Sequence, residues 1–121
     1  MDIPATLRAQ ARDLRTEFPR SPRETLGGYV LAARAVDKCR ASLCGINGEY
    51  NFNCPLDVMF FRFAGLTSEA FKALVATGAT DHEVEAWISA NATRHSAADI
   101  MAWNSKTGPQ FRHLDVEEGR I

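Results

Sequence analysis

The sequence predicts a compact all-α domain, a single bundle of about five to seven short helices that cross at steep angles. Apolar residues recur at helical spacing over most of the chain. Capping residues precede three of the apolar runs, and prolines and glycines leave only brief connections between them. A chain of 121 residues fits one domain, which we expect to cover residues 1–121.

The first helix is predicted over residues 3–18. Three apolar side chains share one face of it: Leu7, Leu14 and Phe18. Pro19 ends the helix, because proline lacks the amide donor. Residues 21–24, Ser-Pro-Arg-Glu, have the pattern of a capping box with proline at the first helical position, so we expect a turn of helix there. Gly27-Gly28 interrupts it.

The next helix is predicted over residues 30–44. Its apolar face carries Leu31, Ala32, Ala35, Val36, Cys39 and Leu43. The opposite arc carries Arg34, Asp37, Lys38 and Arg40. One interpretation of this arc is a solvated charged face with ion pairs at i±3. The other is a face that binds a ligand.

Gly45 ends that helix, and Asn47-Gly48 predicts a tight turn. Polar residues alternate with Tyr50 and Phe52, which predicts a short extended segment. The following helix, Pro55–Ala64, is apolar nearly all the way round. Such a helix is expected at the centre of the protein.

Three short helices are predicted in the second half of the chain, each begun by a hydroxyl cap. The caps are Thr67, Thr80 and Ser96. The last two helices share the pattern of a cap, an inward β-branched residue and an inward tryptophan, Trp87 or Trp103. Gly78 and Gly108 are stop signals. We expect residues 109–121 to be anchored by Phe111 and Leu114 and to be mobile beyond them.

Composition excludes several classes of partner. With 45% apolar residues, 24% charged residues and a net charge of −1, the chain offers no electrostatic reason to bind nucleic acid or an anionic membrane. No leader or membrane-spanning run is apparent, and we expect a cytoplasmic protein. The three histidines and three cysteines lack metal-ligand spacing, and no nucleotide-binding or hydrolase motif occurs, so we expect no metal and no cofactor.

Cys54 is a candidate reactive residue. It lies directly before Pro55 at the predicted start of a helix, where unpaired amides and the helix dipole favour a thiolate. The alternative is an ordinary buried thiol, because free cysteines are commonly buried and no histidine lies nearby in sequence.

A small-molecule site is the first functional hypothesis. The Gly27-Gly28-Tyr29 turn, the Arg34/Asp37/Lys38 face and the loop over residues 49–57 are expected to converge on an anionic or polar ligand. The predicted ligand-binding residues are Tyr29, Arg34, Lys38, Arg40 and Tyr50. If the protein is an enzyme, which the sequence leaves open, the candidate catalytic residues are Asp37, Glu49 and Cys54.

A non-catalytic interaction module is the second hypothesis. In it, an exposed apolar face around Trp87 or Trp103 holds another protein or a second copy of the chain. It predicts that at least one of these tryptophans is exposed, whereas the first hypothesis predicts a concave pocket.

Part of the chain also resembles a known family. The motifs are Phe18-Pro19-Arg20-Ser21-Pro22-Arg23, Leu26-Gly27-Gly28-Tyr29, Arg34, Asp37-Lys38-Cys39-Arg40-Ala41 and Gly48-Glu49-Tyr50. They are similar to those of the bacterial family known as domain of unknown function 5069, over most of residues 13–90. The resemblance implies a small helical bacterial protein. It implies no activity, substrate or catalytic residue.

Overall fold

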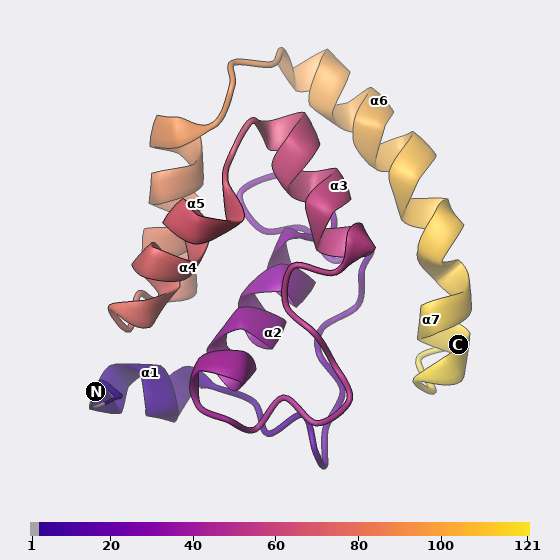
Figure 1. Ribbon diagram of the computed structural model, residues 1–121. Helices are drawn as coiled ribbons and strands as arrows, with labels where there is room; N and C mark the ends of the chain where they lie inside the picture. The colour runs from indigo at the N-terminus through magenta and orange to yellow at the C-terminus, as the bar shows by residue number, and fades with distance from the viewer. Residues whose placement is uncertain (1–2) are drawn as a thin grey trace.

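The helix α2 (Ala32–Leu43) is the central element of the fold. In the computed structural model, which describes residues 3–121, every residue from Ala32 to Ala41 is buried. Figure 1 shows α2 with α4 and α5 on one side and the α6–α7 arm on the other. Leu31 precedes the helix with a left-handed backbone (φ 72°), and its carbonyl oxygen accepts the first helical hydrogen bond, from Ala35.

Residues 3–121 form seven α-helices and one 3₁₀ turn, and the all-α prediction is confirmed. Besides α2, these are α1 (Ala5–Gln10), α3 (Pro55–Ala64), α4 (Ser68–Ala76), α5 (Asp81–Asn91), α6 (Ala97–Thr107), η1 (Gly108–Phe111) and α7 (Arg112–Glu117). The three predicted caps are confirmed. Thr67, Thr80 and Ser96 each accept a hydrogen bond from the backbone amide three residues on, and Thr80 forms a complete capping box with Glu83.

The predictions for the N-terminal third are partly wrong. The helix predicted over residues 3–18 ends at Gln10, and Phe18 is 48 % exposed. Residues 21–24 form a turn and no helix. The Ser21 hydroxyl accepts a hydrogen bond from the Arg23 amide and donates one to the Asp115 carboxylate. This distant partner holds the segment in an irregular conformation that local propensity does not reveal.

The extended segment predicted around Tyr50 and Phe52 is also absent from the described residues. Turns replace it: the Asn47 side-chain amide donates to the Tyr50 carbonyl, and Asn53 has a positive φ of 63°. Within residues 3–121, β-type pairing is limited to an isolated antiparallel bridge between Leu26 and Tyr29.

Aromatic side chains from α3 and α4 fill the core beside α2. Phe60, Phe61 and Phe71 are buried, with ring centroids 5.1–6.2 Å apart. Trp87 of α5 packs edge-on against Phe71. However, α3 is not fully surrounded as predicted, because Val58, Met59 and Phe63 are only partly buried and Arg62 is exposed.

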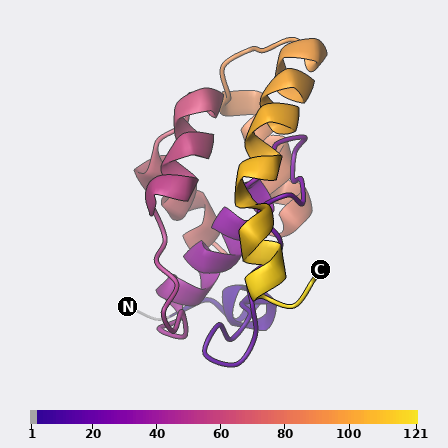
Figure 2. The same cartoon turned by 90° about the vertical axis from the view of Figure 1, so that its right-hand side faces the viewer.

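The C-terminal segments form an arm along one side of the body. Figures 1 and 2 show α6, η1 and α7 following one another past the ends of α3 and α2. Residues 109–121 therefore carry a 3₁₀ turn and a helix, and their mobility in solution stays a prediction. Among the described residues, no helix has the length and apolar character needed to cross a membrane.

Candidate functional site

The charged arc of α2 is buried, so the interpretation of a solvated face is wrong. Arg34, Asp37, Lys38 and Arg40 are between 2 % and 4 % exposed. Each is paired with an oppositely charged residue from elsewhere in the chain: Arg34 with Glu118 (2.7 Å), Asp37 with Arg20 (3.0 Å), Lys38 with Asp57 (2.9 Å) and Arg40 with Asp81 (3.0 Å). Burying a charge is costly unless it is paired in this way. The arc thus ties four other segments to α2.

The two predicted tyrosines also make internal contacts. Tyr29 is buried, its ring lies edge-on to Phe60, Phe63 and Trp103, and burial raises the pKa of its hydroxyl. The Tyr50 hydroxyl donates to the Glu118 carboxylate (3.2 Å), and the Arg34 guanidinium lies 5.5 Å from the centre of the Tyr50 ring. Glu49, in contrast, is exposed.

Cys54 lies at the N-cap of α3 beside two charged groups. The Lys38 ammonium donates to the Cys54 sulfur (3.0 Å) and is 2.9 Å from Asp57 Oδ1. The other Asp57 carboxylate oxygen accepts a hydrogen bond from the backbone amide of Asn53 (2.8 Å). Burial raises the pKa of Asp57, and the charge of Lys38 opposes that change. The sequence placed Cys54 at a helix start correctly, but the contact with Lys38 required the fold.

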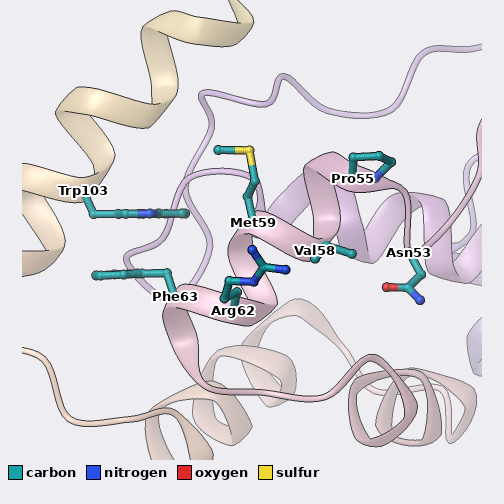
Figure 3. Close-up of a pocket in the computed structure, with 7 residues that line it drawn as sticks. All are labelled: Asn53, Pro55, Val58, Met59, Arg62, Phe63 and Trp103. Atoms are coloured by element: carbon teal, nitrogen blue, oxygen red, sulfur yellow. The ribbon is translucent and has the colours of Figure 1, made fainter.

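A groove lies between α3 and α6, next to the residues that flank Cys54. Its volume is about 690 Å³, which lies within the roughly 300–1,000 Å³ typical of small-molecule sites. It is lined by Asn53, Pro55, Val58, Met59, Arg62, Phe63 and Trp103 (Figure 3). The lining is mostly apolar, with an amide at one end and a guanidinium on one side.

The aromatic end of the groove is a stack of parallel rings. Figure 3 shows the Phe63 and Trp103 rings parallel to each other. Their centroids are 4.6 Å apart at an interplanar angle of 3°, and His95 stacks on Phe63 at 4.2 Å and 7°. The His95 Nε2 atom is 2.8 Å from the Phe63 carbonyl oxygen, which fixes the ring. This stack joins α6 to α3, and its Phe63 and Trp103 rings form the aromatic part of the groove lining.

The groove overlaps the predicted site only at its edge. Asn53 and Pro55 belong to the predicted 49–57 loop, and Tyr29 contacts Phe63 and Trp103 from the core side. The other predicted site residues do not line it: Arg34, Asp37, Lys38, Arg40, Glu49 and Tyr50. Cys54 does not line it either, but lies between two residues that do.

The sequence pattern does not reveal the α3 part of the groove, because a helix that is apolar nearly all the way round is expected in the core. The segment that packs beside α3 is α6, and little of its surface is apolar and buried. Ile100 and Trp103 are its large apolar residues with partial burial, and Met101 is 68 % exposed. A helix with so narrow an apolar stripe cannot cover the whole outer face of α3.

Residues 3–121 contain no group of three or more His, Cys, Asp or Glu side chains placed to hold a metal ion. Comparison with the curated proteins gives no match for the chain. The family model of DUF5069, a domain of unknown function, matches residues 16–111, so the chain belongs to the DUF5069 family.

Proposed function

We propose that the protein binds a small molecule with a flat apolar part and an acidic group in the groove between α3 and α6. The observation that carries this proposal is the combination of an open apolar groove with an unpaired cation. Arg62 is exposed, and within residues 3–121 its guanidinium has neither a hydrogen bond nor an ion pair. It is therefore free to bind an acidic group, for which arginine is well suited.

The apolar part of the ligand would lie on the walls formed by Val58, Met59 and the Phe63–Trp103 stack. From Pro55 to Phe63 the helix rises by roughly 12 Å, enough for a two-ring molecule. Asn53 adds a side-chain amide at the far end, which can donate or accept a hydrogen bond (Figure 3). Most of the binding free energy would come from apolar burial, and Arg62 would orient the ligand.

Anilinonaphthalene sulfonate, an aromatic anion with a planar naphthalene ring, is a suitable probe. We expect saturable binding at one site per chain, followed by the fluorescence of the probe. The variant Arg62→Gln should weaken binding about tenfold, because a hydrogen bond to a charged group contributes ~1.5–3 kcal/mol. Arg8→Gln, an exposed arginine on α1, is the matched control and should bind as wild type. Equal binding by both variants would refute the proposed role of Arg62.

Cys54 allows a second measurement of the same site. Of the three candidate catalytic residues it lies nearest to the groove, because its neighbours Asn53 and Pro55 line it. The bound probe should therefore slow alkylation of Cys54 by iodoacetamide. Cys44, which is also partly exposed, is the internal control and should react at an unchanged rate. If the probe binds but protects neither thiol, it lies elsewhere.

The interaction module remains the competing function. Trp87 and Trp103 are both partly buried, so neither stands out as an exposed anchor. If two copies pack through the same groove, binding of the probe will decrease as protein concentration rises, and sedimentation velocity will show a dimer. A monomer at all concentrations, with unchanged probe affinity, favours the small-molecule site.

A further inference from the structure

A second cleft lies where the end of α1, α2 and the start of α5 meet, away from the α3–α6 groove. It has a volume of about 340 Å³ and is lined by Gln10, Arg12, Arg20, Asp37, Arg40 and Asp81. Unlike the groove, it is lined by polar and charged side chains. Three guanidinium groups and two carboxylates line it, and the Glu24 carboxylate, outside the lining, lies 3.8 Å from the Arg20 guanidinium.

Arg40 forms the buried base of this cluster. Its side chain is 5 % exposed, and it donates to the Ala79 carbonyl (2.9 Å) and pairs with Asp81 (3.0 Å). Its Nε atom is buried and has no hydrogen-bond acceptor within residues 3–121. A buried donor without an acceptor is unfavourable, so the Arg40 guanidinium has hydrogen-bonding capacity that residues 3–121 leave unsatisfied.

Arg12 and Asp81 form the accessible part of the cluster. The Arg12 side chain is 42 % exposed and held only loosely, with its Nε 3.7 Å from Asp37 Oδ2. The Asp81 side chain is 41 % exposed, yet its carboxylate bridges Arg20 (2.8 Å) and Arg40 (3.0 Å). Asp81 thus occupies the position between two arginines that the acidic group of a ligand would take.

The protonation state of Asp81 fits this arrangement. Partial burial opposes ionisation, but the hydrogen bonds and charges of Arg20 and Arg40 outweigh it and hold the pKa of Asp81 below its usual range. At neutral pH the residue is therefore an anion, and it competes with any other anion for the same two arginines.

We propose that this cleft is a binding site for a small phosphate-type oxyanion, which contacts Arg12 and takes the place of the Asp81 carboxylate between Arg20 and Arg40. The wild-type protein would bind weakly, because Asp81 must first move away. A larger ligand that carries the oxyanion would bind more tightly, because its other contacts offset the free energy needed to displace Asp81. Arginine is the residue best matched to such groups, because its planar fork donates two parallel hydrogen bonds.

The test uses inorganic phosphate as the probe, titrated calorimetrically into the full chain against sodium chloride of equal ionic strength. Asp81→Asn removes the competing charge and should bind phosphate at least fivefold more tightly than wild type. Arg12→Ala should weaken binding at least fivefold in either background. Arg15→Ala is the matched control, because Arg15 is exposed, pairs with Asp13 and does not line the cleft.

Circular dichroism will show whether each variant is folded. If Asp81→Asn does not fold, the comparison of Arg12→Ala with wild type still tests the proposal, because Arg12 is at an exposed site. Absence of a phosphate signal above the chloride signal in wild type and in the folded variants would overturn the proposal. So would an equal loss of binding in Arg12→Ala and Arg15→Ala, since that indicates binding by overall positive charge. None of these results depends on whether the α3–α6 groove binds a ligand.

Discussion

At the level of single residues, the main finding is that a charged helix face lies inside the protein. The alternation of Arg34, Asp37, Lys38 and Arg40 is the same whether the face meets water or meets opposite charges. The deciding factor is the part of the chain that covers this face, here the irregular segment around Arg20, the first turn of α3 with Asp57 and the C-terminal end. Spacing along one helix carries no information about those partners.

The pair formed by Lys38 and Asp57 gives a direct test of this burial. Lys38→Met should lower the free energy of unfolding by ~3–5 kcal/mol, because it leaves the fully buried Asp57 without its cation. Lys72→Met, at an exposed site on α4, should stay within ~0.5 kcal/mol of wild type. Urea titration measures both. Adding Asp57→Leu to Lys38→Met should recover part of the lost free energy of unfolding. Equal stability of Lys38→Met and Lys72→Met would contradict the burial of the Lys38–Asp57 pair.

Two glycines of one loop differ in the space around them. Both have left-handed backbones, Gly45 with φ 71° and Gly48 with φ 55°. A Cβ atom at Gly48 would lie 2.7 Å from the Leu14 carbonyl oxygen, whereas one at Gly45 would have no neighbour within 4 Å. We expect Gly45→Ala to cost about 1–2 kcal/mol from backbone strain and Gly48→Ala to cost distinctly more. Similar urea midpoints would show that the Gly48 loop lies farther from Leu14.

At the level of elements, the sequence predicted best those helices whose ends are set locally. The caps at Thr67, Thr80 and Ser96 are satisfied within four residues, so the pattern contains all the information needed. The segment over residues 21–24 has an equally good cap pattern but no helix. There the Ser21 hydroxyl bonds to Asp115 of the distant helix α7, and this tertiary contact overrides the local preference.

The candidate site likewise combines features that the local sequence predicts with features that depend on tertiary contacts. Cys54 at a helix start and the 49–57 loop at the edge of a hollow follow from local signals. The groove does not, because it depends on how much of α3 the α6 arm leaves uncovered. A sequence shows that a helix is apolar on all sides but does not show which side its neighbours reach.

The attachment of α7 should depend on pH through Glu118. Burial alone would raise the pKa of Glu118, but hydrogen bonds from Arg34 and Arg120 outweigh it and lower the pKa. A carboxyl group with a lowered folded-state pKa contributes stability above its unfolded pKa of about 4.3, and this is lost as pH falls through the folded value. The free energy of unfolding of wild type should therefore decrease on acidification below about pH 5.

Glu118→Gln isolates this effect. At neutral pH the variant should be less stable than wild type, because Arg34 loses a buried charged partner, and the difference should shrink as pH falls to about 3. Glu117→Gln, at an exposed position of the same helix, should follow the wild-type curve. Urea unfolding across this pH range measures all three. A constant difference between Glu118→Gln and wild type would contradict the account.

At the level of the whole molecule, buried ion pairs and aromatic stacking hold different parts of the fold together. Ion pairs tie the segment around Arg20, the start of α3, the start of α5 and the C-terminal end to α2, while rings from α3, α4 and α6 build much of the apolar core. Because α6 is held to α3 mainly at the Trp103–Phe63 stack, the outer face of α3 stays open. That opening is the basis of the proposed function.

The most direct test of that proposal is a titration of the ¹⁵N-labelled protein with anilinonaphthalene sulfonate, followed by the two tryptophan indole resonances. Trp103 lines the groove, whereas Trp87 packs on Phe71 in the core and serves as an internal control. We expect the Trp103 resonance to shift with saturation while the Trp87 resonance stays in place. A stationary Trp103 resonance at saturating probe would contradict the proposed site.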